Sequence, residues 1–267
     1  KVEDSAFSNC QKIKELSLPI DTVYSPNAFS KCNIDRLNLS NNITSLSKEN
    51  VSSYLSCISS DSLSLLIPGS VSEIDLTLFD EYSSITDIEI EESSAYYSSV
   101  DGIIYNKDKT VLLRCPRGKK EISLIPDTVT SISKGAFLNC DKLTNISLPK
   151  SVQNIHQSAF ENCSSLLSIV IPIGVLKVER AFVGCTSLNN INCEAPLKPF
   201  DWTTDWNNVS ASKSISPRWN FMQNSVLIQG VYYTLEDEEK NSLVISGYEI
   251  EDIKTDCSLA QEAQVYG

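Results

Sequence analysis

Several residue types are scarce in this chain of 267 residues, and each shortage excludes a class of protein. Basic residues are few, since 22 Lys and Arg stand against 34 Asp and Glu and leave a formal net charge of −12. Nucleic-acid binders and basic membrane-surface proteins need clustered positive charge, so the composition predicts no nucleic-acid partner. No apolar run approaches the roughly 18 residues of a membrane span. The 41% of hydrophobic residues is ordinary for a folded chain, which excludes a disordered one.

Histidine is scarcer still, because His156 is the sole one. A general base must lie within hydrogen-bond reach of its partner, and nothing around His156 in the sequence indicates a serine or carboxylate partner, so we interpret it as a surface loop residue. No nucleophile elbow, phosphate-binding loop or paired metal-ligand spacing is present. The acidic run Glu236 to Glu239 is expected to form an exposed hairpin turn, since calcium loops place ligands at alternate positions. The sequence predicts no catalytic residue, no cofactor and no metal site.

What the chain does contain is an internal repeat over most of residues 2–193. Three segments, beginning at Ala136, Ala159 and Ala181, each carry Ala-Phe, then a Cys three residues after the Phe, then apolar residues three, six and eight positions after that Cys. Neighbouring copies are 22 to 25 residues apart, except across one interruption. Seven aromatic residues mark the copies: Phe7, Phe29, Tyr54, Phe79, Phe137, Phe160 and Phe182.

This period predicts one short strand per turn of a solenoid, because a turn that cannot bury its apolar side chains alone must stack on its neighbours. A second apolar pair in each turn, such as Val129 and Ile132, predicts that the chain returns along another side. Proline lacks the N–H for a further ladder bond and is expected to end the strand. It does so after five of the expected strands, at Pro19, Pro68, Pro126, Pro149 and Pro172.

Units such as residues 125–149, IPDTVTSISKGAFLNCDKLTNISLP, resemble the BspA-like class of leucine-rich repeats. The resemblance implies a right-handed leucine-rich-repeat solenoid (a β/α superhelix) of mostly short β-strands with short helical or 3-10 corners, plus β-hairpin insertions. Proteins of this class are mostly surface and secreted proteins of bacteria, with some from protists. An extracellular or cell-surface location is therefore implied, although the sequence shows neither a signal nor an anchor.

We expect five parts along the chain. Residues 1–93 form a first block of repeats that starts inside a repeat, and residues 121–193 form a second block. Between them, residues 94–120 are typical of a β-hairpin, with strands at 103–105 and 111–114, which covers an edge or joins two sub-arrays. Residues 194–225 contain Trp202 and Trp206, which are expected to cap the last apolar turn. Residues 226–267 are expected to hold a second hairpin and a tail, or the start of a further module.

The nine cysteines suggest a disulfide framework at first sight. Six of them share one repeat position, and Tyr82 occupies that position in the seventh copy. A position that accepts Cys or Tyr is a packing position, so reduced core thiols are expected there, with occasional disulfides between stacked neighbours as the alternative. The six are Cys10, Cys32, Cys57, Cys140, Cys163 and Cys185, while Cys115, Cys193 and Cys257 lie outside the phase.

The outward positions of the expected strands form a candidate ligand face, which we call the strand face. Its first half is charged and its second half is polar to apolar. Repeat proteins commonly bind partners along such extended surfaces, but a solvated face without a partner would look alike. The candidate residues are Lys14, Glu15, Asp35, Arg36, Asn38, Asp87, Glu89, Asn145, Ser147, Ser168, Asn189, Asn190 and Asn192.

Three functions remain open from the sequence. The first is a non-enzymatic extracellular binding or adhesion module; the resemblance implies a host or neighbouring-cell protein or glycan as its partner. The second is a structural spacer or stalk that presents another domain at the cell surface. The third is a hydrolase whose catalytic domain lies outside this sequence, and for this one the chain offers no residues.

Overall fold

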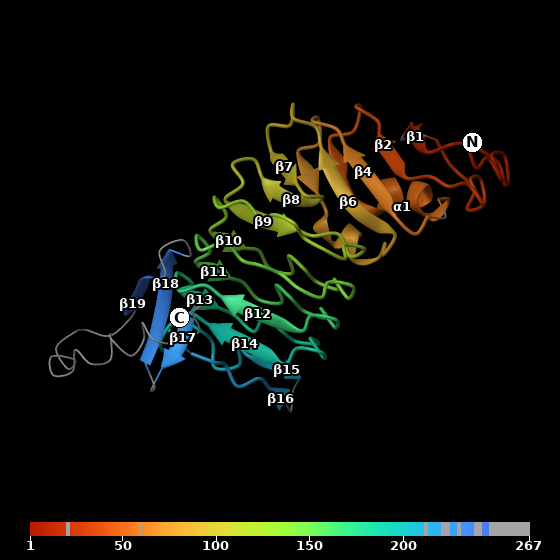
Figure 1. Ribbon diagram of the computed structural model, residues 1–267. Coiled ribbons are helices and arrows are strands. Elements are labelled where there is room, and N and C mark those ends of the chain that lie inside the picture. The colour runs from red at the N-terminus through yellow and green to blue at the C-terminus, as the bar shows by residue number, and fades with distance from the viewer. Residues whose placement is uncertain are drawn as a thin grey trace, which may run out of the picture.

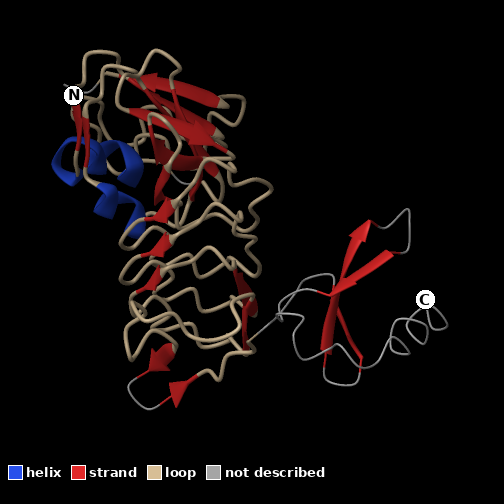
Figure 2. Cartoon of the chain, turned by 90° about the vertical axis from the view of Figure 1, so that its left-hand side faces the viewer, coloured by secondary structure: helices blue, strands red, loops and turns tan. Residues whose placement is uncertain are grey.

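The structure, a computed structural model, describes residues 1–19, 22–58, 60–210, 213–219, 225–228, 231–237 and 242–245. It is a solenoid of stacked coils (Figure 1), which confirms the expected fold class. Helix is confined to α1 (Lys48–Ser56) and the 3-10 helix η1 (Leu76–Asp80) in the described residues. Figure 2 shows both in the N-terminal part of the solenoid.

One side of the first block is a four-stranded parallel sheet with the order β1-β2-β4-β6. Leu16, Leu37, Leu65 and Ile88 are successive register partners across it, so the inward apolar positions of the repeat stack from coil to coil. The strands are β1 (Glu15–Leu18), β2 (Arg36–Leu39), β4 (Leu63–Ile67) and β6 (Ile85–Ile90).

The expected return of the chain along another side is also present. The second apolar pair of each coil lies in short parallel strands, and in the second block these belong to a sheet with the order β13-β11-β10-β9-β8-β7. The first block has the equivalent pair β3 (Ser45–Leu46) and β5 (Glu73–Ile74). The long sheet consists of β7 (Tyr97–Val100), β8 (Ile103–Asn106), β9 (Val111–Arg114), β10 (Ser131–Ile132), β11 (Asn154–Ile155) and β13 (Lys177–Val178).

The hairpin region contacts both blocks, and it also borders the outer strand β6, since the amide of Ile88 donates to the carbonyl of Gly102. Strand β9 pairs in parallel with β10 and antiparallel with β8, and β8 pairs antiparallel with the additional strand β7. Successive side chains of a strand point to opposite faces. Ile103 and Tyr105 accordingly pack in the core of the second block, while Ile104 between them packs in the core of the first. Strand β8 is thus a wall shared by two cores.

A buried ion pair reinforces this junction. The guanidinium of Arg114, only 4% exposed, contacts the carboxylate of Asp80 from the first block and donates to the carbonyl of Gly135 from the second. Burial lowers the pKa of Arg114, because a charge loses its hydration there. We call these three residues the Arg114 junction.

The corners of the coils differ from the helical corners that we expected. Most are chains of turns, because one or two residues in each of these corners adopt the left-handed conformation and interrupt a helix. One precedes Ala, as at Ser158 (φ 58°), and the other precedes Cys. The second position holds Asn in three coils, which tolerates this conformation, and Gly in a fourth. Its φ values are 64° at Asn9, 58° at Lys31, 61° at Asn139, 60° at Asn162 and 79° at Gly184.

A pair of substitutions at this position tests the role of the left-handed residue. Gly184→Ala is expected to lower the free energy of unfolding by about 1–2 kcal/mol, because alanine is strained at positive φ and its Cβ would lie 3.1 Å from the Cα of Asn162. Lys31→Gly at the equivalent position is expected to raise it by up to about 1 kcal/mol. Urea unfolding followed by circular dichroism measures both, and shifts of the same sign would contradict the argument.

The cysteine position has a hydrogen-bonding function that its packing role does not require. Four of the repeat thiols donate to a backbone carbonyl of the preceding coil, and in three of them that carbonyl belongs to the repeat phenylalanine. The sulfur-to-oxygen distances are 3.0 Å from Cys32 to Phe7, 3.1 Å from Cys163 to Phe137, 3.0 Å from Cys185 to Phe160 and 3.8 Å from Cys140 to Cys115.

None of the eight described cysteines forms a disulfide, and all of them except Cys10 are buried. Cys115 and Cys193, which the sequence set apart, are core residues as well. The amide of Cys115 donates to the carbonyl of Ala136, as the amide of Phe137 does to Ala159, so Cys115 takes the place of a repeat phenylalanine. Burial raises the pKa of Cys193 to about 12 and that of Cys57 to about 11. Cys257 lies outside the described residues.

The aromatic cap closes the second core. Trp202 and Trp206 are 2% and 3% exposed and meet edge-to-face with ring centroids 4.6 Å apart, and Trp219 packs against both. Strands β15 (Asn208–Ser210) and β16 (Lys213–Ser214) lie nearby in sequence.

The second expected hairpin is present as β18 (Val231–Asp237) and β19 (Ser242–Ile245), joined by β17 (Ser225–Ile228). Glu236 and Asp237 are therefore strand residues rather than part of a turn, and residues 246–267 lie outside the described part.

Candidate binding face

The charged half of the strand face is held together by its own ion pairs. Arg36 on β2 donates two hydrogen bonds to Glu89 on β6, with nitrogen-to-oxygen distances of 2.5 and 2.7 Å. Glu89 lies two strands away from Arg36 and also accepts from Ser64 on the strand between them, at 2.9 Å. Asn38 accepts from Arg36 at 3.1 Å and donates to Glu15 on β1 at 2.6 Å. One polar network thus crosses all four strands.

This network sets the charge states of its members. The hydrogen bond to Arg36 lowers the pKa of Glu89, and the same bond raises the pKa of Arg36. Lys14 and Asp35 form a further pair at 3.2 Å, and Asp87 pairs with Lys119 at 2.8 Å. Every charged residue of the predicted face therefore has an oppositely charged neighbour. Arg36 serves both Glu15 and Glu89, so carboxylates still outnumber cations in these pairs.

The second half of the strand face is a two-stranded parallel sheet of β12 (Ser168–Ile171) and β14 (Asn190–Cys193). Asn189 is exposed, and Ser168 and its register partner Asn190 are half-buried. Asn192 was expected on the open face and is instead 9% exposed. The cause is the cap, because the backbone of Arg218 runs beside β14 and bonds to Ile191 and Cys193. Asn192 is thus removed from the candidate surface.

Asn145 and Ser147 occupy a break in the face. Both are exposed, and the neighbouring Ile146 and Leu148 point into the core as the repeat predicts. Residues 143–149 nevertheless form no strand, so the sheet of the first block and the β12–β14 sheet are separate. The strand face is therefore not continuous, contrary to the uniform ladder that the repeat suggests.

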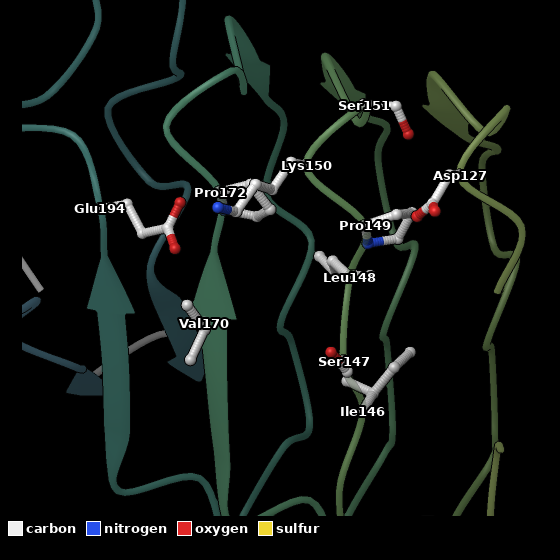
Figure 3. A pocket seen from close by; sticks show the side chains of 10 residues that line it. All are labelled: Asp127, Ile146, Ser147, Leu148, Pro149, Lys150, Ser151, Val170, Pro172 and Glu194. Carbon is white, nitrogen blue, oxygen red and sulfur yellow. The ribbon is translucent and has the colours of Figure 1, made fainter. Parts of the chain in front are cut away.

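A groove lies at this break. Its cavity has a volume of about 520 Å³ and lies between residues 146–149 on one wall and Val170 and Pro172 on the other. Asp127, Lys150 and Glu194 stand around it (Figure 3). Sequence reasoning missed Asp127, Lys150 and Glu194, because they lie beyond the strand positions, next to the prolines that end the strands. We call this site the groove.

The repeats are also recognised by comparison with known proteins. The profile described as "BspA type Leucine rich repeat region" matches six copies, in residues 1–100 and 119–204. The chain belongs to the BspA-type leucine-rich repeat family. No curated protein matches it.

Among solved structures, the BspA-type chain resembles a leucine-rich repeat protein from Eubacterium ventriosum with a TM-score of 0.51 and 20% identity, over 77% of this chain and 61% of that one. A leucine rich cell surface protein from Faecalibacterium prausnitzii matches with a TM-score of 0.33 and 20% identity, over 79% and 66% of the two chains. The pneumococcal vaccine antigen PcpA matches with a TM-score of 0.36 and 18% identity, over 73% and 58%. The chain thus spans less than two thirds of the length of each of these proteins.

His156 has a partner that the sequence did not indicate. Its Nδ1 lies 2.9 Å from a carboxylate oxygen of Glu179 in the next coil, and Lys177 lies 2.8 Å from the other oxygen of that carboxylate. Hydrogen bonds from Lys177 and His156 lower the pKa of Glu179. Imidazole and carboxylate here form a surface pair between stacked coils, and among the described residues no serine or cysteine side chain bonds to the ring.

Among the described residues, no group of three or more His, Cys, Asp or Glu side chains gathers in a way that would hold a metal ion. None of the helices in that part of the chain is long and apolar enough to cross a membrane.

The exposure of the thiols leads to a labelling prediction. In a Cys257→Ser background, iodoacetamide at pH 8 is expected to modify Cys10 first, because Cys10 is only half-buried and belongs to the first coil, where the thiol has no preceding Phe carbonyl. The other seven described thiols are buried, and burial disfavours the reactive thiolate. Mass spectrometry of native and urea-unfolded protein measures the order. Labelling of Cys163 or Cys193 in native protein as fast as Cys10 would show that the coils open or that this packing is wrong.

Proposed function

We propose that this BspA-type chain is a non-enzymatic extracellular binding and adhesion module that recognises a protein or glycan of a host or neighbouring cell along its strand face. The supporting observation is that outward polar positions recur in register on successive coils while their inward neighbours are buried. Such a regular surface suits a long partner that makes many weak contacts. The extracellular setting rests on the family, whose members are mostly surface and secreted proteins.

A second candidate function is a structural spacer or stalk that presents another domain at the cell surface. One specific observation favours it, namely that each charged residue of the predicted face already pairs with another side chain of this chain. Charges paired in this way connect neighbouring coils and are less available to a partner. The two functions differ in one measurable respect, since only the first requires a partner that binds the face.

The experiment is a binding screen of the chain against immobilised extracellular-matrix proteins and glycans, run beside an Arg36→Glu/Asn190→Lys variant. Arg36→Glu places a second carboxylate beside Glu89, and Asn190→Lys adds a charge on β14, so a partner on the strand face should bind at least about tenfold more weakly. Circular dichroism of both proteins controls for folding. A partner that binds wild type and variant equally contradicts recognition along the strand face. If no immobilised protein or glycan binds the chain, the result supports the stalk.

A further inference from the structure

The groove lies where a ladder of backbone hydrogen bonds between two neighbouring coils begins and does not continue. In the first block, the amides of Asp35 and Arg36 donate to the carbonyl of Lys14, and the β1–β2 ladder follows. In the second block, the amide of Asn189 donates to the carbonyl of Leu167, and the β12–β14 ladder follows. The same entry bond joins Leu167 to the carbonyl of Thr144. No further backbone bond connects residues 145–148 with β12 within the described part of the chain.

Two backbone edges are therefore left without partners on either side of the groove. The free edge of β12 faces it, since β12 pairs with β14 only. Residues 145–148 form the opposite edge, and their inward side chains Ile146 and Leu148 anchor that edge in the core. Unpaired backbone groups at the edge of a strand can bond to an added strand, which satisfies them. This is the arrangement at which an extended peptide can insert or dock by strand addition.

The side chains around the groove contrast with those of the first block. Asp127, Lys150 and Ser147 make no side-chain hydrogen bond or ion pair among the described residues, whereas the charged residues of the predicted strand face in the first block are all paired. The carboxylate of Glu194 accepts a hydrogen bond from the backbone amide of Ile173 at 3.0 Å, and this bond holds the carboxylate beside the groove. The groove thus offers two carboxylates and one ammonium to a ligand, and the balance is acidic.

We infer that the groove between residues 146–149 and β12 binds an extended peptide segment that carries a basic side chain. The peptide backbone bonds to the free edges, and its basic side chain pairs with Asp127 or Glu194. A volume of about 520 Å³ falls within the usual range for a ligand site, roughly 300–1,000 Å³. This inference rests on the proposed function, since it assigns the class of partner and the part of the face that holds it.

The test uses fluorescein-labelled heptapeptides of alternating valine and lysine and measures fluorescence anisotropy with the full chain. A second peptide carries N-methyl groups on alternate backbone amides, which removes donors and keeps every charge. Ser147→Trp fills the groove, and Ser17→Trp at the same repeat position on β1 is its matched control. Both serines are exposed, so both variants are expected to fold.

We expect N-methylation of the peptide and Ser147→Trp each to weaken peptide binding at least about tenfold, the equivalent of one or two lost backbone hydrogen bonds. Asp127→Lys should weaken it by about the same factor, and Ser17→Trp should leave it unchanged. Equal binding of both peptides, or equal loss in the two tryptophan variants, overturns the inference. A glycan whose binding is lost in Ser147→Trp while the peptides do not bind overturns the peptide class.

The outcomes also separate this inference from the proposed function. A partner from the matrix screen that is lost in Arg36→Glu/Asn190→Lys but retained in Ser147→Trp overturns the groove and leaves the proposed function standing. Peptide binding that depends on Ser147 while the matrix screen is silent supports the groove and counts against the wider face.

Discussion

Phe160→Ala is expected to lower the free energy of unfolding by about 3–5 kcal/mol, the range for removing a fully buried aromatic side chain. Phe160 is 0% exposed and stacks between Phe137 and Phe182, with ring centroids 5.0 and 5.5 Å away. Its loss opens a cavity in the middle of a coil stack, where neighbours on both sides are fixed by their own coils. Urea unfolding followed by circular dichroism measures the loss.

Phe7→Ala is the matched control, since Phe7 has the same repeat position in the first coil. Its ring is 43% exposed and stacks on one side only, on Phe29 at 5.2 Å. A half-exposed side chain loses less burial, so the expected change is about 1 kcal/mol. Equal losses for Phe7 and Phe160 would show that position in the stack does not determine the energy of the corner.

The second large effect is expected at the Arg114 junction. Asp80→Ala leaves the buried guanidinium of Arg114 without its counter-charge and should cost about 3–5 kcal/mol. The junction connects the first core to the second, so the loss should also uncouple them. We expect urea unfolding of this variant to show two transitions where the wild type shows fewer.

Two controls distinguish a buried charge from a mere contact. Asp80→Leu/Arg114→Met replaces the pair with apolar side chains and should recover most of the loss, because no unpaired charge remains. Arg36→Ala removes an equally well-formed pair whose side chains are 32% and 44% exposed, and should cost only about 0.2–1 kcal/mol. A double variant as unstable as Asp80→Ala would contradict the electrostatic explanation.

Much of the fold could be predicted because it repeats. The phenylalanines, cysteines and prolines stand at equivalent positions in several coils, and one physical argument about stacking accounts for them together. Part of the corner conformation could also have been found, since the Asn or Gly before the Cys, as at Asn139, Asn162 and Gly184, is the sign of a left-handed residue.

The remainder depends on residues that occur once. The pairing of Arg114 with Asp80 joins a residue of the hairpin region to one of the first block, 34 positions apart, and no period relates them. The burial of Asn192 depends on Arg218 in the cap, which lies outside the repeat. The opening beside β12 could not be predicted either, since residues 144–148 and 167–171 have patterns that would allow a ladder. The sequence therefore reveals neither the ion pairs of the first block nor the break at residues 143–149.

The thiol-to-carbonyl bonds have an evolutionary consequence. Each connects a coil only to the one before it, and so do the stacked phenylalanines, so a gene duplication or deletion of one whole coil creates a junction like those already present. The number of coils within a block can therefore change during evolution at little cost to folding. The same event between Asp80 and Arg114 would separate a pair that has no second copy, so that stretch should keep its length when the blocks on either side do not.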